Sequence, residues 1–317
     1  MNKSIKIVFF GTPEFATGVL DALHKSQHEI AAVVTAPDKP AGRGRKINES
    51  DVKKYAVAHG LPVLQPKNLK AEDFLEELAS FKADVQVIVA FRMLPEAVWK
   101  MPSLGTFNLH ASLLPQYRGA APINWAIINQ EKVTGVTTFF IDDKIDTGAI
   151  ISNQETLISP LENVETLYDR LMKMGAELSL ETVNSIATGT VPTTVQKDHT
   201  DLKEAPKLDS KNTLIDFTKS AVAVDALIRG LYPYPVAKAS LYNKEQMVVK
   251  IHKSKVVEKQ HKMTPGSFVI ENGEMFVACG TNMIEIEELQ LPNKKRLKIK
   301  DLLNGYTFVP DARFDVA

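Results

Sequence analysis

Strand-like apolar runs alternate with helical segments through the first half of the chain, and this alternation restricts the possible fold more than any other feature. The runs IKIVFF (5–10) and DVQVIVA (84–90) are apolar almost throughout, as is typical of strands buried on both faces of a sheet. After the first run, Thr12 and Pro13 are expected to be the N-cap and the first position of a helix over 14–26. The further predicted strands are 29–35, 105–110, 133–141 and 148–156, and the further predicted helices are 51–60, 71–82 and 123–130. The alternation predicts an α/β fold built on a Rossmann-like, doubly wound parallel sheet.

The pattern changes near residue 189. A capping box at Ser159-Pro-Leu-Glu162 is expected to open a long helix that Gly189 ends. The polar segment 190–206 has no helical stripe and is interpreted as a linker. After it, one helix (218–229) precedes many short alternating segments, which are typical of a small OB-like β-barrel. We therefore predict a first domain over 1–189, a linker over 190–206 and a C-terminal OB-like domain over 207–317.

Composition limits the class of protein. The length of 317 residues favours two domains, and the formal net charge of zero excludes a general polycation. The single cysteine, Cys279, cannot form an intramolecular disulfide and is interpreted as a small buried residue. The longest apolar run, VQVIVAF, is too short to cross a membrane, and MNKSIKIVFFG is expected to be a strand rather than a signal peptide. These features predict a soluble cytoplasmic protein.

Two polar residues lie on one face of the predicted strand 105–110. Side chains alternate along a strand, so Asn108 and His110 project to the same side at its carboxyl end, where open α/β sheets bind their ligands. Downstream, Asp142, Asp143 and Asp146 crowd one short turn. An amide donor, an imidazole and a carboxylate make an acyl-transfer site possible, because they can stabilise an oxyanion and move a proton. By spacing alone, a structural histidine beside a solvated acidic loop is an equally good interpretation.

The residues resemble those of a known family. NLHASLLPQYRGAAPINW followed by IDTG is similar to the 10-formyltetrahydrofolate-dependent formyltransferases, and GTPEFA, LPVLQP and a C-terminal domain of matching size extend the resemblance over essentially the whole chain. The segment PDKPAGRGRK is similar to the members of this family that act on tRNA. The resemblance implies transfer of the formyl group of 10-formyltetrahydrofolate to the α-amine of initiator methionyl-tRNA, with no metal and no covalent enzyme intermediate.

The resemblance also implies roles for particular residues. Asn108, His110 and Asp146 would be catalytic: Asn108 and His110 would stabilise the oxyanion, and Asp146 would keep His110 charged or oriented. The loop that follows would hold the tetrahydrofolate, and two stretches of backbone would surround its pterin. The loop consists of Ser112, Leu113, Leu114 and Pro115; the backbone stretches are Ala90, Phe91, Arg92, Met93 and Leu94, and Asp142, Asp143, Lys144 and Ile145.

Basic residues are the expected contacts for tRNA. The predicted contacts are Lys39, Arg43, Arg45, Lys46 and Lys207. Residues 207–317 carry 17 lysines and arginines against 13 aspartates and glutamates, with basic groups at 250–262 and 294–300. Such groups suit backbone contacts with an RNA arm, although each alone is equally typical of a solvated loop or strand edge. The chain is expected to act as a monomer, with no membrane and no protein partner.

Two departures from the family pattern and two competing hypotheses stay open. Arg92 stands where a Tyr-Gly pair is more usual and would reshape the folate pocket or lie on the surface, and Ala149 stands where an acid is frequent. A formyltransferase for a small amine, such as an amino-sugar nucleotide or glycinamide ribonucleotide, would use the same core but leave PAGRGRK without a role. A non-enzymatic RNA- or nucleotide-binding protein is less consistent with the sequence, because GTPEFA lacks the spaced glycines of a dinucleotide site. Salt dependence separates the tRNA-acting enzyme from the small-amine enzyme, since tRNA binding weakens steeply with salt whereas binding of a small neutral amine does not.

Overall fold

The computed structural model describes residues 3–41, 46–189, 191–197 and 201–316. The chain forms two compact units that interleave along the sequence. The first comprises Met1–Gly119, Val133–Thr156 and Tyr168–Glu204, and the second comprises Ala120–Lys132, Leu157–Leu167 and Ala205–Ala317. The predicted boundaries at 189 and 206 leave the segments 120–132 and 157–167 in the first domain, whereas in the structure they belong with the C-terminal residues.

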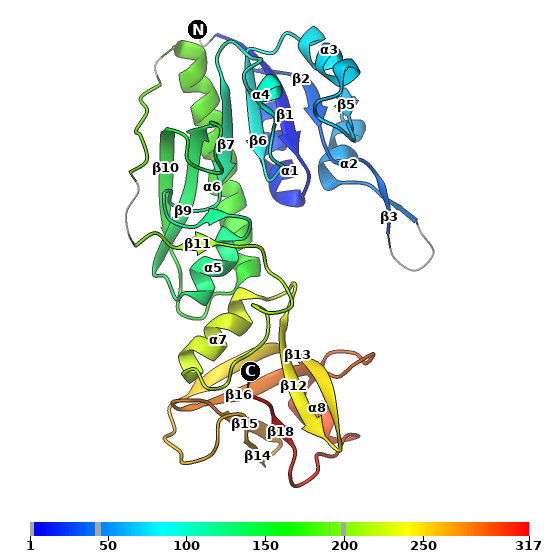
Figure 1. The fold of residues 1–317 in the computed structure, drawn as a ribbon, viewed down its shortest axis with the longest axis vertical. Helices are drawn as coiled ribbons and strands as arrows, with labels where there is room; N and C mark the ends of the chain where they lie inside the picture. The colour runs from blue at the N-terminus through cyan, green and yellow to red at the C-terminus, as the bar shows by residue number, and fades with distance from the viewer. Residues whose placement is uncertain (1–2, 42–45, 190, 198–200, 317) are drawn as a thin grey trace. The chain divides into compact units, whose positions relative to one another are not determined.

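The first unit is built on a seven-stranded sheet with the order β10-β9-β7-β6-β1-β2-β5 (Figure 1). Its strands are β1 (Lys6–Gly11), β2 (Glu29–Val34), β5 (Val63–Leu64), β6 (Val85–Val89), β7 (Thr106–His110), β9 (Val133–Phe140) and β10 (Ile150–Leu157). The pairs from β5 to β7 are parallel, which confirms the Rossmann-like prediction. The prediction of a parallel sheet is wrong for one strand: β9 runs antiparallel to β7. Local apolar pattern does not encode strand direction, because direction depends on where the connection delivers the chain.

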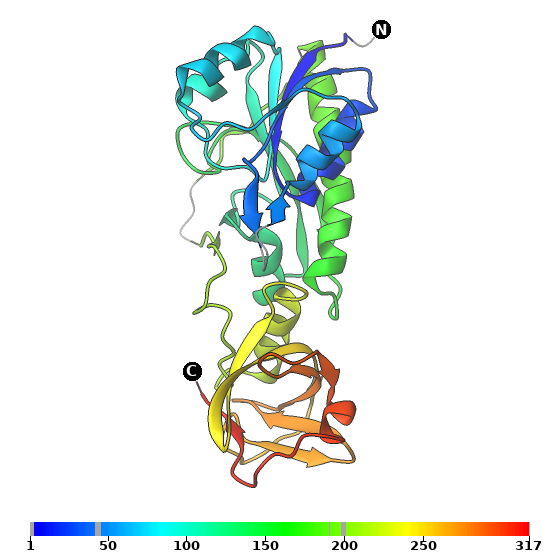
Figure 2. The same cartoon turned by 90° about the vertical axis from the view of Figure 1, so that its right-hand side faces the viewer.

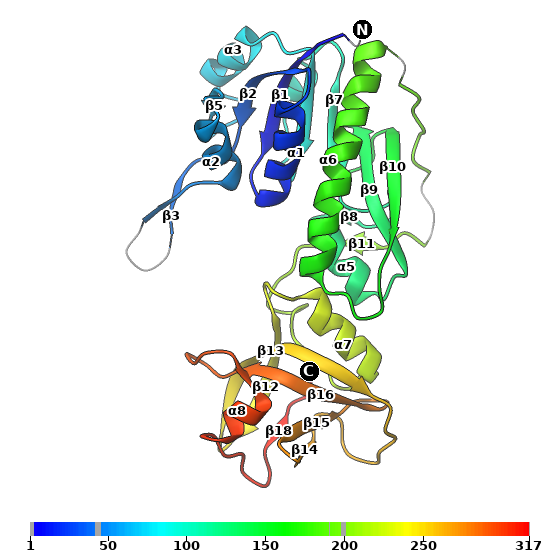
Figure 3. The ribbon, with the colours of Figure 1, turned by 180° about the vertical axis from the view of Figure 1, so that it is seen from behind.

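Helices cover both faces of this sheet. The helices are α1 (Glu14–His24), α2 (Asp51–Ala58), α3 (Glu72–Ser80), α4 (Glu96–Trp99) and α6 (Val164–Thr188). On one face, Val8 and Phe10 of β1 join a buried cluster with Phe74 of α3 and Val98 of α4. The other face is covered by α1 and α6 (Figure 3), and Gly175 of α6 packs so closely on Leu109 that a Cβ would lie 2.6 Å from Leu109 Cδ2. Burial on both faces explains why β1 and β6 are apolar apart from Lys6 and Gln86.

Two predicted helix caps are wrong, Thr12 by one residue and Ser159 by four. Helix α1 begins at Glu14 with Pro13 as its N-cap, because the extended Pro13 supplies the carbonyl that accepts from Ala16 N at 2.9 Å, so Thr12 is not the cap. Glu162 does accept from Ser159 N at 3.1 Å, but this bond closes a separate turn. Helix α6 starts at Val164, after Asn163, whose Oδ1 accepts from Thr166 N at 3.1 Å. Gly189 follows its last residue with a φ of 76°, as predicted.

The predicted linker is hydrogen-bonded to the first unit along its described parts. Thr194 exchanges backbone hydrogen bonds of 2.8 Å with Ile150. Further on, Tyr117 N donates to Lys203 O at 2.6 Å, where β8 (Arg118–Gly119) pairs with β11 (Glu204–Ala205). The segment is polar because it lies along a surface, yet its backbone is held in place.

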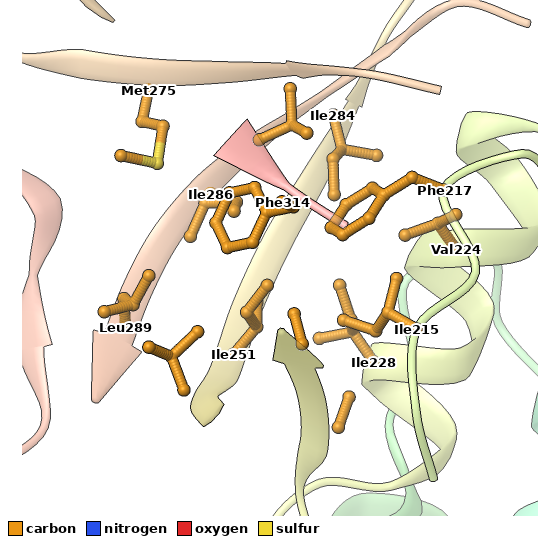
Figure 4. Packing of buried hydrophobic residues seen from close by; sticks show 14 of the residues in the cluster. Ile215, Phe217, Val224, Ile228, Ile251, Met275, Ile284, Ile286, Leu289 and Phe314 are labelled. Atoms are coloured by element: carbon orange, nitrogen blue, oxygen red, sulfur yellow. The ribbon is translucent and has the colours of Figure 1, made fainter. Parts of the chain in front are cut away.

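The second unit contains a nearly closed antiparallel barrel, as the OB-like prediction expects. Its strands follow the order β14-β15-β16-β13-β12-β18, with β17 beside β16. They are β12 (Ala237–Asn243), β13 (Glu245–Val257), β14 (Phe268–Glu271), β15 (Glu274–Ala278), β16 (Met283–Gln290), β17 (Leu297–Lys298) and β18 (Arg313–Phe314). A bridge between Ser267 and Arg313 joins the two ends of this order, and Figure 2 shows the strands, coloured yellow to red, curving around a shared interior. Phe217, Ile251, Ile284 and Phe314 fill that interior (Figure 4).

Helices from two distant parts of the sequence complete the second unit. Helix α7 (Ala221–Gly230) places Val224 and Ile228 in the barrel core, and α8 (Ile299–Leu303) adds its own apolar side chains. Helix α5 (Pro122–Ile128) packs on α7, where Asn124 Nδ2 donates to Gly230 O at 2.8 Å. Within the described ranges, the helices include none with the length and apolarity to cross a membrane.

Candidate active site

Strand β7 delivers Asn108 and His110 at the carboxyl end of the parallel part of the sheet. Asn108 lies between Ile88 of β6 and Phe139 of β9 in the strand registers. The neighbours Phe107 and Leu109 are buried, as expected for the opposite face. The Asn108 side chain is half-buried and has no hydrogen bond within the part of the chain that the structure describes. Its amide is therefore available to a ligand.

His110 is buried and held by one strong hydrogen bond. Its Nε2 lies 2.8 Å from the carbonyl oxygen of Tyr117. A carbonyl oxygen only accepts, so Nε2 carries a proton. The other ring nitrogen, Nδ1, faces Asp146 Oδ2 at 3.9 Å and is the atom that can take up or release a proton. The structure thus brings together two of the three residues predicted to be catalytic.

The acidic turn positions Asp146 with a left-handed backbone. Asp146 has a φ of 55°, and its Oδ2 accepts from Gly119 N at 3.0 Å. Asp142 has a structural role in the turn, because it accepts from Lys144 N and Thr147 Oγ1 at 3.1 and 2.8 Å. The other members of the stretch predicted to contact the pterin, Asp143, Lys144 and Ile145, are exposed.

The turn closes tightly at Gly148. A Cβ added there would lie 1.6 Å from Phe140 O, so only glycine fits. The next residue, Ala149, has no polar side chain, so it adds no side-chain hydrogen bond to the turn. Its backbone carbonyl accepts from Phe140 N at 3.0 Å.

The loop predicted to hold the folate is fixed by internal hydrogen bonds. Ser112 is fully buried, and its Oγ donates to Gln116 O at 2.7 Å. Thr137 Oγ1 donates to Ser112 O at 2.7 Å and accepts from Leu114 N at 3.2 Å. The Ser112 hydroxyl is thus used inside the loop, and Leu113 and Pro115 are its half-buried members.

The second backbone stretch, Ala90 to Leu94, follows the carboxyl end of β6. Ala90 is exposed with a φ of 48°, and Phe91 packs edge-on against Phe10 at 5.6 Å between ring centroids. Arg92 lies on the surface and donates to the carbonyls of Pro66 and Lys67, which favours the surface interpretation of this residue. Met93 is 65% exposed, whereas Leu94 is buried.

Sequence reasoning missed a set of residues around Asp146. Tyr117 and Gly119 act through their backbones on His110 and Asp146. Gln196 donates from Nε2 to the carbonyls of Asp146 and Gly148 at 3.0 and 2.8 Å, and its Oε1 accepts from Arg118. The family motif RGAAPI, which begins at Arg118, points to the segment of Tyr117 and Gly119. Nothing in the polar sequence around Gln196 points to that residue.

The residues predicted to contact tRNA are partly described. Lys39 is exposed in β3 (Lys39–Ala41), which pairs with β4 (Lys46–Asn48), so Lys46 begins that strand. Arg43 and Arg45 lie outside the described residues. Lys207 is exposed in the second unit. The structure does not test these contacts, which stay predictions.

The base of the β3–β4 hairpin is anchored by charge. Lys53 Nζ lies 2.5 Å from Asp38 Oδ2 and 2.8 Å from Glu49 Oε1. The hydrogen bond from Lys53 lowers the pKa of Asp38, and Gln65 adds a second one. The one acid of the basic segment 38–46 is therefore paired with a lysine of α2.

Comparison with known proteins defines the class. A family profile described as "Formyl transferase" matches residues 5–183, and one described as "Formyl transferase, C-terminal domain" matches residues 207–307. The chain therefore belongs to the formyl transferase family, as the sequence motifs predicted.

Individual relatives make the comparison more specific. Methionyl-tRNA formyltransferase of Flavobacterium johnsoniae is 53% identical over 312 residues, which cover 98% of this chain and 99% of the relative. Methionyl-tRNA formyltransferase of Bacteroides thetaiotaomicron is 47% identical over 312 residues, covering 96% and 97%. Among solved structures, an N-formyltransferase of Helicobacter canadensis in complex with folinic acid and dTDP-3-aminofucose has a TM-score of 0.67 at 21% identity, covering 91% of this chain and all of that one. HypX of Aquifex aeolicus in complex with tetrahydrofolic acid has a TM-score of 0.64 at 17% identity, covering 95% of this chain and 47% of that one.

Proposed function

We propose that this formyl transferase transfers the formyl group of 10-formyltetrahydrofolate to the α-amine of initiator methionyl-tRNA. The observation that carries the proposal is 53% identity to a methionyl-tRNA formyltransferase over nearly the whole of both chains. The sugar-acting structure shares the fold at only 21% identity and gives no reason to prefer a small amine.

Asn108, His110 and Asp146 would supply the chemistry. The folate co-substrate provides an activated formyl group. The half-buried Asn108 amide would donate a hydrogen bond to the oxygen on which negative charge develops when the amine attacks. His110 would hold or pass a proton through Nδ1, which faces Asp146, while its Nε2 stays bound to Tyr117 O. His110 is only 6% exposed, which limits the access of water to the imidazole.

The residues predicted to hold the folate suit a flat, polar ring with apolar faces. Ala90 is exposed just after β6, and Met93, three residues further on, exposes a large apolar side chain. In the acidic turn, Ile145 is 62% exposed and offers a second apolar surface beside polar backbone. Ser112, Leu114 and Thr137 would act by fixing the shape of the loop.

The tRNA would be held mainly through its phosphates. Lys39, Lys46 and Lys207, with Arg43 and Arg45, are the proposed contacts, because lysine and arginine release counterions when they neutralise a polyanion. We also propose that the protein works in the cytoplasm and that it is a monomer. Sedimentation or light scattering would test the monomeric state.

A transfer assay with three amines tests the proposed function. Purified protein and 10-formyltetrahydrofolate are incubated with methionyl-tRNA, with free methionine or with an amino-sugar nucleotide. Formylation of methionyl-tRNA alone is expected, with an apparent affinity that falls steeply as salt is raised. Product on the amino-sugar nucleotide and none on tRNA would reject the tRNA as substrate while keeping the formyl chemistry.

A further inference from the structure

Three consecutive residues, 117–119, each bind a different side chain of the proposed site: His110, Gln196 or Asp146. The carbonyl of Tyr117 accepts from His110 Nε2 at 2.8 Å. The guanidinium of Arg118 donates to Gln196 Oε1, from Nη2 at 2.8 Å and from Nε at 3.2 Å. The backbone N–H of Gly119 donates to Asp146 Oδ2 at 3.0 Å. This short segment is therefore a common frame for His110 and Asp146, and Arg118 extends it to Gln196.

Gln196 uses its whole side-chain amide in this arrangement. Its oxygen accepts from Arg118, and its NH₂ group donates to Asp146 O at 3.0 Å and Gly148 O at 2.8 Å. An amide NH₂ has two protons, so both carbonyls are bound at once. Only one orientation of the amide satisfies these partners, because a guanidinium cannot accept and a carbonyl cannot donate. Arg118 thereby fixes which way Gln196 points.

The backbone that Gln196 binds is unusual. Asp146 has a φ of 55°, a conformation that few residues other than glycine adopt readily. Gly148, two residues on, is packed so closely against Phe140 O that no side chain fits. Bonds to the carbonyls on both sides of Thr147 hold this turn in one shape. The direction of the Asp146 carboxylate depends on that shape.

We propose that Gln196, oriented by Arg118, is a positioning residue that holds the Asp146 carboxylate against His110 Nδ1. The inference rests on the proposed catalytic role of Asp146. At 3.9 Å, the carboxylate and Nδ1 are near the limit of a direct interaction, so a small rotation of the turn changes their coupling. Misplacement of a catalytic group by about 1 Å costs about 10²-fold in rate. The segment 191–197 thus contributes to catalysis through Gln196.

The test compares Gln196→Met in two backgrounds. Methionine has a similar length and makes none of the amide's hydrogen bonds. In the wild-type background, kcat for methionyl-tRNA formylation is expected to fall about 10- to 100-fold, with KM for tRNA changed less than about twofold. In an Asp146→Asn background, single-turnover rates should show no further loss, because the carboxylate that Gln196 positions is gone.

The controls separate positioning from folding. Gln27→Met removes an exposed amide that donates to Asn184 and should leave kcat unchanged. If Gln196→Met fails to fold, Gln196→Glu replaces it, since glutamate keeps the oxygen that faces Arg118 and loses both donors. Circular dichroism and the melting temperature establish folding for each variant.

Each outcome decides the inference. An equal loss in both backgrounds would assign Gln196 a purely structural role and overturn the inference, as would wild-type kcat in the single variant. Wild-type activity of Asp146→Asn alone would instead reject the proposed role of Asp146. The two failures are therefore distinguishable.

Discussion

Asn108 differs from the other two proposed catalytic residues in its surroundings. His110 and Asp146 are bound to Tyr117 O and Gly119 N, whereas the Asn108 amide has no hydrogen bond among the residues described. A half-buried amide left without a partner is poised for a ligand, because burying it unsatisfied is unfavourable. At the residue scale, the proposed site therefore combines a fixed His110–Asp146 pair with an available amide donor.

Asn108→Ala is expected to lower kcat by about 10²–10³, as for other single oxyanion donors. The fold should persist, since no described hydrogen bond is lost. Steady-state kinetics with saturating folate and methionyl-tRNA measure the effect. Wild-type kcat in a folded variant would reject Asn108 as the oxyanion donor.

Cys279 should resist thiol reagents until the protein unfolds. Its side chain is fully buried in the barrel core, and burial raises the pKa of its thiol to about 12. Labelling with Ellman's reagent at pH 8 should be slow in buffer and complete in denaturant. Rapid labelling without denaturant would show that the barrel core opens locally.

Turns, more than strands or helices, determine where the proposed catalytic side chains lie. The acidic turn between β9 and β10 ends at Gly148, which lies against the backbone of Phe140. The loop after β7 is fixed by Ser112 and Thr137. Rigid elements provide the frame, and these two connections aim the functional groups.

Gly148→Ala is expected to destabilise the first unit by about 3 kcal/mol or more, because the new Cβ meets a backbone oxygen that cannot rotate away. Urea unfolding measures the change. Gly305→Ala is the matched control, since a Cβ added at Gly305 would meet no atom within 4 Å. Equal stability of the two variants would contradict the tight closure of the turn.

The Tyr55–Asp21 contact between α2 and α1 is expected to make the free energy of unfolding sensitive to alkali. Burial and the hydrogen bond from Tyr55 Oη to Asp21 Oδ1 raise the pKa of Tyr55 to about 12. A raised pKa means that the neutral phenol stabilises the fold fully below pH 10, and this stabilisation is lost as the pH rises to 12. Tyr55→Phe should lose less unfolding free energy between pH 10 and 11 than the wild type does. Parallel curves for the two proteins would refute the prediction.

Local pattern predicts the long elements and the strand that carries the site. Strands β1 and β6 are predictable because their apolar runs are nearly continuous, and the Asn108–His110 face follows from strand alternation. The two-residue strands β8 and β11 are not predictable, because they exist only through their pairing. Gln196 is missed for a related reason: its partners Asp146 and Arg118 lie 50 and 78 residues away in the sequence.

At the scale of the whole molecule, the chain passes repeatedly between its two units. Helix α5 and residues 157–167 are distant in sequence from the barrel but belong to the same compact unit. Trp125 Nε1 donates to Pro206 O at 2.8 Å, and Arg229 Nη1 donates to Glu162 O at 2.7 Å. Residues 205–317 therefore make up only part of the second compact unit.

A fragment of residues 207–317 should fold less stably than the barrel does in the full chain. It lacks α5, and the α7 surface around Gly230, where a Cβ would lie 2.5 Å from Ile128 Cγ1, would be left uncovered. Loss of such buried apolar contacts exposes the fragment to aggregation and broadens its melting transition. Calorimetry against the full chain measures the difference. A sharp transition at the same temperature would show that α5 is dispensable.

The placement of α5 in the barrel unit has a consequence for synthesis on the ribosome. Helix α5 ends at Ile128, and its packing partner α7 begins at Ala221, so about 90 residues separate their emergence. Synthesis proceeds at roughly 5–20 residues per second, so the apolar side of the nascent α5 stays exposed for about 5–20 s before α7 is made. During that interval the segment is a natural target for chaperones, and slower translation of the connecting region would lengthen its exposure.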